Sequence, residues 1–232
     1  MLHHVSDEVS YQSLRPYAIS KNCFLRLLDY LQEKGYTTST FQHLQKCSTK
    51  REVIITFDDC GRHLFDFAIP ELIRRGMKAC FYIPTAHING INSWDVAEGK
   101  VAVELMNEND IQELLRLGME IGSHSHHHIR LSEINEAHFI DEVKTSKNIL
   151  ESITQHLVLS FSYPFGGVPV TAKKTLSEAG YQYAVGIYTP FQNRYALRRS
   201  IYHDGDTAAT LTQKLSPIYK IYRSLSDWRR KS

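Results

Sequence analysis

TFDDC, residues 56–60, follows the apolar run Val53-Ile54-Ile55 and ends a predicted buried strand on two adjacent carboxylates, Asp58 and Asp59. Two neighbouring carboxylates repel each other, and burying them is costly unless a cation or a proton offsets the charge. We therefore expect another part of the chain to bring a positively charged group to the end of this strand.

Strand-like and helix-like segments alternate along the chain. The helical patterns place apolar residues on one face, and several end at a glycine, such as Gly35, Gly76 and Gly118. This alternation predicts an α/β fold in which crossover helices join parallel strands, as in a complete or irregular (β/α) barrel or a doubly wound sheet. The predicted strands are 52–57, 78–85, 119–124, 157–167 and 181–187, and the predicted helices are 20–35, 68–76, 109–118, 138–153 and 171–180.

The composition limits the class of protein. Hydrophobic residues make up 42% and charged residues 22% of the 232-residue chain, as in an ordinary globular domain. A net charge of +2 gives no electrostatic reason to expect binding to nucleic acid. Because no internal repeat or Gly-, Ser- or Pro-rich linker interrupts the chain, we expect one catalytic domain over residues 1–232.

The cellular compartment is predicted from the cysteines and the apolar runs. Cys23, Cys47, Cys60 and Cys80 form no CxxC pair, which is compatible with a reducing compartment. No apolar run approaches the ~18 residues needed to cross a bilayer. The N-terminal MLHHVSDEVS lacks the hydrophobic region of a signal peptide. We therefore expect a cytoplasmic protein.

The C-terminal segment, residues 208–232, combines apolar residues with a basic cluster that includes Arg229, Arg230 and Lys231. It is typical of a terminal helix docked on the domain. A basic amphipathic helix that makes peripheral contact with a membrane, or with a partner, is the alternative.

His124 and His128 lie four residues apart, at the end of the predicted strand 119–124 and in the segment after it. One aspartate with two neutral imidazoles is a ligand set for zinc and related divalent metals, and it leaves positions open for water and substrate. If one carboxylate binds the metal, the other can accept a proton from water. Taken alone, an Asp-Asp pair at the end of a strand is more often a helix cap or a pair of loop residues. A histidine-rich run, taken alone, is more often a solvated loop. Their joint position at ends of parallel strands favours a metal site.

The motifs TFDD at 56–59, HSHHH at 124–128 and SYPFG at 162–166 occur in this order. With them the chain resembles the polysaccharide deacetylase family, also called the NodB-homology or carbohydrate esterase 4 family, over most of its length. The resemblance implies a deformed (β/α) barrel of about seven strands. It also implies a divalent metal and hydrolytic removal of an acetyl group from an N-acetylated sugar.

The same resemblance implies roles for individual residues. Asp58 matches the catalytic base, and Asp59, His124 and His128 match the metal ligands. The turn Pro164-Phe165-Gly166 matches the motif whose main-chain N–H helps to hold the oxyanion. Zinc is the expected metal, and Co²⁺, Ni²⁺ or Fe²⁺ would suit the same ligands.

The general acid is expected at the N-terminal end of the chain. MLHHV resembles the YHH opening of a branch of this family that includes the poly-N-acetylglucosamine deacetylases, and His3 aligns with the acid of that branch. Two alternatives stay open. In the first, His3 and His4 are frayed terminal residues without a role in catalysis. In the second, His203 in IYHDGD is the general acid.

Three features depart from the family pattern. The late Leu-x-x-His motif, which supplies the general acid in many members, is not recognisable. Cys60 stands where the first motif usually has glycine, either as a small buried residue in the turn or as an additional thiol ligand. Ser162 stands where many members carry an arginine that orients the base. Arg198 or Arg199 could supply the missing guanidinium.

The predicted function is a metal-dependent hydrolase that cleaves the amide of an N-acetylated sugar, in a polysaccharide or in its precursor. An amidase or deformylase acting on a small amide is the first alternative. A non-catalytic carbohydrate-binding protein is the second, and the incomplete motifs favour it, whereas Asp58 argues against it. Trp94 lies in a long predicted loop, where it contacts substrate or packs. The oligomeric state is left open.

Overall fold

A computed structural model describes residues 1–44, 51–187, 189, 192–216, 218–219, 221–223 and 226. Its strands are β1 (His4–Val5), β2 (Ala18–Ile19), β3 (Tyr36–Thr38), β4 (Arg51–Val53), β5 (Ile55–Asp58), β6 (Ala79–Ile83), β7 (Glu120–Ser123), β8 (Ser160–Ser162), β9 (Tyr183–Gly186) and β10 (Leu197–Arg198). Its α-helices are α1 (Lys21–Glu33), α2 (Ala68–Arg74), α3 (Ser93–Val96), α4 (Glu108–Arg116), α5 (Glu136–Thr154), α6 (Ala172–Glu178) and α7 (Ala208–Lys214). Short 3₁₀ turns are η1 (Val9–Leu14), η2 (Phe41–His43), η3 (Arg62–Asp66), η4 (Thr85–His87) and η5 (Pro164–Gly166).

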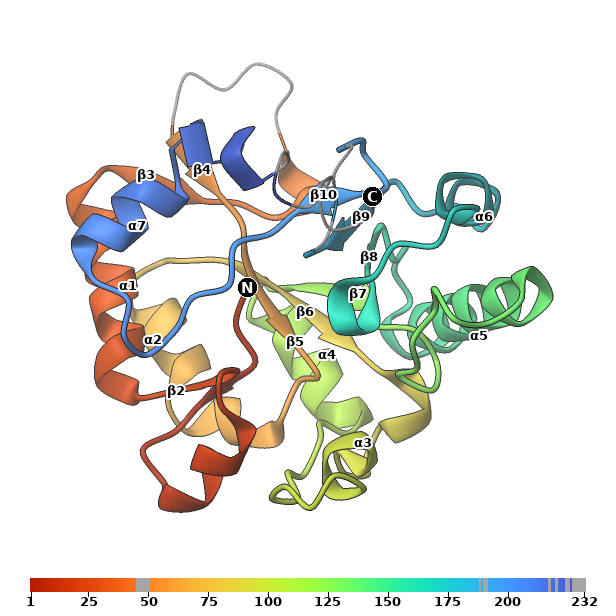
Figure 1. Cartoon of the computed structure of the whole chain (residues 1–232). Helices are drawn as coiled ribbons and strands as arrows, with labels where there is room; N and C mark the ends of the chain where they lie inside the picture. The colour runs from red at the N-terminus through yellow and green to blue at the C-terminus, as the bar shows by residue number, and fades with distance from the viewer. Residues whose placement is uncertain are drawn as a thin grey trace.

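A curled parallel sheet forms the centre of the molecule (Figure 1). Its six strands follow the order β10-β9-β8-β7-β6-β5, and every neighbouring pair is parallel. The predicted α/β class and deformed barrel are confirmed, with six strands in this sheet instead of about seven. Because all strands run the same way, their carboxyl ends meet at one edge.

The helices begin where the sequence supplies a cap. Ser20 accepts a hydrogen bond from the backbone N–H of Cys23 at the start of α1, at 3.2 Å. Asn107 and Asp110 form a reciprocal capping box on α4. Helices flank the central sheet on both sides. In Figure 1, α1 and α2 lie on one side, and α5 and α6 lie on the other.

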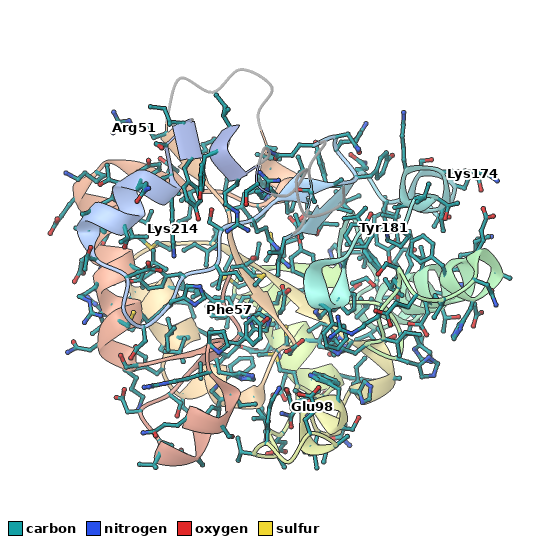
Figure 2. The ribbon with its side chains drawn as sticks, in the orientation of Figure 1. Arg51, Phe57, Glu98, Lys174, Tyr181 and Lys214 are labelled. Carbon is teal, nitrogen blue, oxygen red and sulfur yellow. The ribbon has the colours of Figure 1, made fainter. Side chains whose placement is uncertain are left out.

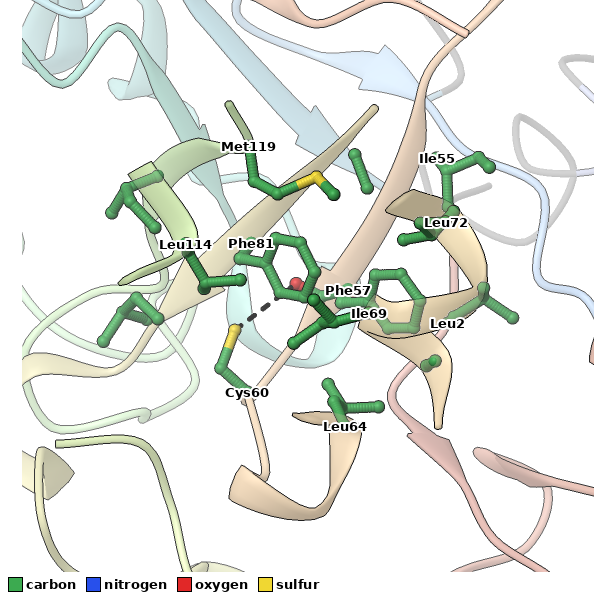
Figure 3. Packing of buried hydrophobic residues seen from close by; sticks show 14 of the residues in the cluster. Leu2, Ile55, Phe57, Cys60, Leu64, Ile69, Leu72, Phe81, Leu114 and Met119 are labelled. Atoms are coloured by element: carbon green, nitrogen blue, oxygen red, sulfur yellow. Dashed lines mark hydrogen bonds between the residues drawn. The ribbon is translucent and has the colours of Figure 1, made fainter. Parts of the chain in front are cut away.

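The core lies between the sheet and these helices. The rings of Phe57 on β5 and Phe81 on β6 stack with centroids 5.0 Å apart, and Ile69, Leu72 and Leu114 surround them (Figure 3). Figure 2 shows Phe57 and Tyr181 inside the fold, whereas Glu98 and Lys174 lie at its periphery. Burial on both faces explains the near-continuous apolar character of these strands.

The predicted strand 52–57 is two strands. β4 pairs with β3 in a separate two-stranded sheet, and β5 enters the main sheet after Ile54. The N-terminal segment lies against the other edge of β5. Leu2 donates to the Thr56 carbonyl at 2.8 Å and accepts from the Asp58 N–H at 2.9 Å. This pairing fixes His3 beside the end of β5.

The C-terminal prediction is described in part. Helix α7 begins at Ala208 and ends at Lys214. Arg229, Arg230 and Lys231 lie outside the described residues.

Of the cysteines, Cys23, Cys60 and Cys80 are free thiols, and Cys47 lies outside the described residues. Within the described ranges, every helix is too short or too polar to span a membrane.

Candidate metal centre and active site

Asp59, His124 and His128 bring three ligand atoms to one buried point. One ligand atom of each residue lies within 4.8 Å of the other two. Asp59 follows β5, His124 follows β7, and His128 lies in the turn after it. The carboxyl edge of the sheet therefore assembles the ligand set predicted from the sequence.

The polar atoms of this cluster fit a bound cation. Nε2 of His128 and Nε2 of His124 lie 3.1 and 3.4 Å from Asp59 Oδ1, yet no described residue donates a hydrogen bond to that oxygen. His124 Nδ1 lies 2.8 Å from the Ser162 carbonyl oxygen, so Nδ1 carries the hydrogen and donates it. The Nε2 lone pair then faces a carboxylate oxygen. Such an arrangement of acceptors is stable when a divalent ion lies between them.

Arg199 supplies the guanidinium that faces Asp58. Its Nη1 lies 2.6 Å from Asp58 Oδ1, and its Nη2 lies 2.7 Å from Asp58 Oδ2. Ser162 Oγ accepts a hydrogen bond from Arg199 Nη2 at 2.8 Å and donates one to Asp58 Oδ2 at 3.1 Å. Arg198, the other candidate, donates from Nη2 to the Thr189 carbonyl. The two parallel hydrogen bonds from Arg199, called the Arg199 fork below, fix both the position and the plane of the Asp58 carboxylate.

Asp58 is ionised in this environment. Burial acts to raise the pKa of its carboxyl, but Arg199 and then His124 act in the opposite direction and hold the pKa below its usual range. Asp58 Oδ2 also lies 3.7 Å from His124 Nε2, so the free carboxylate stands next to the ligand cluster. A carboxylate that is ionised, oriented and close to a metal site can accept a proton.

His3 lies near both carboxylates. Burial lowers the pKa of its imidazole, and the nearby Asp59 and Asp58 act to raise it. The ring packs on Tyr17, with centroids 4.5 Å apart, so the N-terminal segment is ordered here and does not fray. The other candidate, His203, has its described hydrogen-bonding contacts with Pro16, Cys23 and Asp206. His3 therefore stays the candidate imidazole of this site, with His203 as the alternative.

The turn after β8 presents one main-chain donor. Pro164 has no N–H, and the Gly166 N–H donates to the Tyr163 carbonyl at 3.0 Å. Of the three predicted residues, Phe165 alone has an N–H that bonds to no other residue in the described part of the chain. Phe165 adopts φ 58°, and its ring centroid lies 5.0 Å from that of His128. The turn is therefore next to the ligand cluster.

These features agree with a family comparison. A model described as polysaccharide deacetylase matches residues 45–184 of the chain. The chain belongs to the polysaccharide deacetylase family.

Relatives of this deacetylase share most of its length. The Bacillus subtilis protein YxkH is 26% identical over 209 residues, which cover 86% of this chain and 68% of YxkH. The poly-beta-1,6-N-acetyl-D-glucosamine N-deacetylase of Staphylococcus aureus (strain N315) is 22% identical over 213 residues, covering 84% and 71% of the two chains. The structure of the Streptococcus pyogenes deacetylase PplD in complex with acetate superposes with a TM-score of 0.78 at 19% identity, over 94% and 96% of the two chains. This last likeness concerns the fold.

Cys60 of this deacetylase is a core residue. Its side chain is 1% exposed, and its Sγ lies 3.2 Å from the Tyr82 carbonyl and 3.8 Å from the Phe57 carbonyl. Figure 3 shows the thiol among Phe81, Leu64 and other core side chains. This burial fits a small core residue in the turn, and Cys60 is not a member of the candidate cation-binding group of Asp59 and the two histidines.

Glu142 is a functional residue that the sequence reasoning missed. Its Oε2 accepts the backbone N–H groups of His126 and His127, both at 2.9 Å, and its Oε1 lies 2.6 Å from His127 Nδ1. The turn between the two ligand histidines contains residues with positive φ, Ser125 at 63° and His128 at 54°. Glu142 therefore holds an unfavourable backbone in place. A glutamate on the apolar face of the predicted helix 138–153 was the signal for it.

Proposed function

We propose that this deacetylase is a metal-dependent hydrolase that removes the acetyl group from the nitrogen of an N-acetylated sugar. The observation that carries the proposal is the adjacent placement of a cation-binding triad and an ionised carboxylate that is not part of it. Pure sugar binding needs no such carboxylate. Arg199, which completes the orientation of Asp58, also removes the main argument for a non-catalytic protein.

The first task of the site is to hold a divalent cation. Asp59 and the Nε2 atoms of His124 and His128 would be its ligands. When bound, such an ion supplies Lewis acidity, which polarises a carbonyl and lowers the pKa of water toward ~7. We propose zinc, because an Asp-His-His set with open positions suits it, and cobalt, nickel or iron would fit the same donors.

The proton transfers belong to residues of the chain. Asp58 accepts the proton of the attacking water as the new C–O bond forms at the acetyl carbon. Arg199 keeps Asp58 ionised, and Arg199 and Ser162 together fix the plane of its carboxylate during this step. His3 then donates a proton to the sugar nitrogen as the C–N bond breaks, so that acetate and a free amine leave.

The developing negative charge requires a donor. We propose the Phe165 N–H for this role, because Pro164 lacks an N–H and that of Gly166 is bonded to the Tyr163 carbonyl. One such donor contributes about 3–4 kcal/mol of transition-state stabilisation in well-studied hydrolases. Gly166 supports the turn, because a Cβ at its φ of +75° would lie 2.7 Å from the Ile187 side chain.

The relative from Staphylococcus aureus supports a β-1,6-linked N-acetylglucosamine polymer as the substrate class. The predicted cytoplasmic location would instead favour a nucleotide- or lipid-linked precursor. The two classes differ in length and charge, so one assay can separate them.

The experiment measures acetate release by zinc-loaded protein. The substrates are N-acetylglucosamine oligomers, a nucleotide-linked N-acetyl sugar and a small non-sugar amide. Asp58→Asn should keep the metal and lose turnover. Asp59→Asn should lose both the metal and turnover, because Asp59 is the one of the two aspartates that is a proposed ligand. Turnover of the small amide alone would assign an amidase. Sugar binding without any acetate release by the parent protein, with the same binding in Asp58→Asn, would leave a binding protein.

A further inference from the structure

Trp94 stacks on a metal ligand. Its indole lies over the imidazole of His128, with ring centroids 3.8 Å apart and an interplanar angle of 28°. Trp94 is half-buried and belongs to α3, in the long connection between β6 and α4. The Phe165 ring approaches the same imidazole at 5.0 Å and 54°. His128 is thus bordered by two aromatic rings from distant parts of the chain.

The two ligand histidines are held in different ways. His124 is oriented by its Nδ1–H, which donates to the Ser162 carbonyl. The corresponding Nδ1 of His128 is buried and has no hydrogen-bond partner among the residues that the structure describes. Metal-binding histidines are almost always oriented by a hydrogen bond from the second ring nitrogen. The plane of His128 therefore has to be fixed by packing.

The segment that carries Trp94 is itself well anchored. Asn92 is fully buried, donates to the Val101 carbonyl at 3.1 Å and accepts the Val103 N–H at 2.6 Å. His87 meets the indole edge-on, with centroids 5.0 Å apart. Trp94 is thus presented to His128 by a closed loop and not by a mobile tip.

We propose that Trp94 is a positioning residue of the metal centre. Its indole replaces the missing hydrogen bond and holds the His128 ring so that Nε2 faces Asp59. This inference rests on the proposed metal site, but not on the identity of the sugar. Loss of the indole should free the ring torsions of His128 and weaken metal binding, whereas another aromatic ring at position 94 should preserve it.

The first test requires no change at position 94. The chain has two tryptophans, so Trp228→Phe leaves Trp94 as the only indole. Titration of metal-free Trp228→Phe with Co²⁺ should strongly quench the tryptophan emission at one equivalent, because the ion binds next to the ring that stacks on its ligand.

The second test compares metal affinities by competition with a chelator. Trp94→Leu should bind Co²⁺ about 10- to 100-fold more weakly, the usual effect of losing a group that orients a ligand. Trp94→Phe should stay close to the parent, and Val96→Ala on the same short helix should be unchanged. Circular dichroism checks that each variant is folded.

The outcomes separate this inference from the proposed function. The positioning role would be overturned if Trp94→Leu bound Co²⁺ as tightly as the parent. It would also be overturned if Co²⁺ bound to Trp228→Phe without quenching the emission of Trp94. Either result would leave the metal site intact. Failure of the parent to bind Co²⁺ any better than Asp59→Asn would overturn both.

Discussion

Arg199 and Asp58 form a two-pronged ion pair although 141 residues separate them in the chain. Both side chains are almost fully buried, and Ser162 closes the group by contacting each of them. A buried pair of this kind is weak evidence for stability, because desolvation offsets the attraction. Its position beside the ligand cluster indicates that it serves the orientation and ionisation of Asp58.

Replacing Arg199 by lysine should therefore affect turnover more than metal binding. Lysine keeps the charge but cannot form both hydrogen bonds to the Asp58 carboxylate. A displacement of the catalytic base by about 1 Å can lower the rate ~100-fold. We expect kcat to fall by about this factor, with metal content unchanged in elemental analysis. Arg198→Lys is the matched control and should turn over normally. Equal losses in the two variants would contradict the role of the fork.

His3 should be needed for amides and much less for activated esters. His3→Gln removes the proposed proton donor, and general acid catalysis contributes about 10²–10⁴-fold when the leaving group is poor. A phenolate leaving group needs no proton, so hydrolysis of an aryl acetate should be largely retained. The measurement is the ratio of amide to ester turnover in His3→Gln and His203→Gln. A change of that ratio in His203→Gln instead would assign the acid to His203.

Glu142 should stabilise the turn that carries the two ligand histidines. Glu142→Gln loses one acceptor oxygen and places an NH₂ group against N–H donors that are already buried. We expect the free energy of unfolding in urea to fall by about 1–3 kcal/mol. Asp141→Asn, at the neighbouring exposed position of α5, should change it by less than ~0.5 kcal/mol. Similar values for the two variants would show that the turn does not depend on Glu142.

Cys60 should have no part in metal binding. Cys60→Ala removes a buried thiol from the core and should lower the free energy of unfolding by about 1 kcal/mol, with one metal still bound. The Co²⁺-loaded parent should lack the near-ultraviolet charge-transfer band of a thiolate ligand. Such a band, or a loss of metal in Cys60→Ala, would restore the thiol as a ligand.

The sequence by itself determined the class of fold and the ligand set. Apolar runs that alternate with amphipathic helices predict parallel strands, and parallel strands place their following residues at one edge. Asp59, His124 and His128 directly follow such strands or lie a few residues beyond them. Local pattern and topology therefore bring the histidines together with the aspartate pair, and the family resemblance singled out Asp59 as the ligand. The metal's identity, the cytoplasmic location and the membrane contact of residues 208–232 stay predictions.

Only the tertiary structure decided which groups support this set. Arg198 and Arg199 are neighbours in an extended segment, and successive side chains there point to opposite sides, so the register of β10 against β9 selects Arg199. The stacking of Trp94 on His128 likewise depends on how a long connection folds back over the sheet. Such contacts join segments far apart in the chain, and no periodicity within either segment encodes the distance between them.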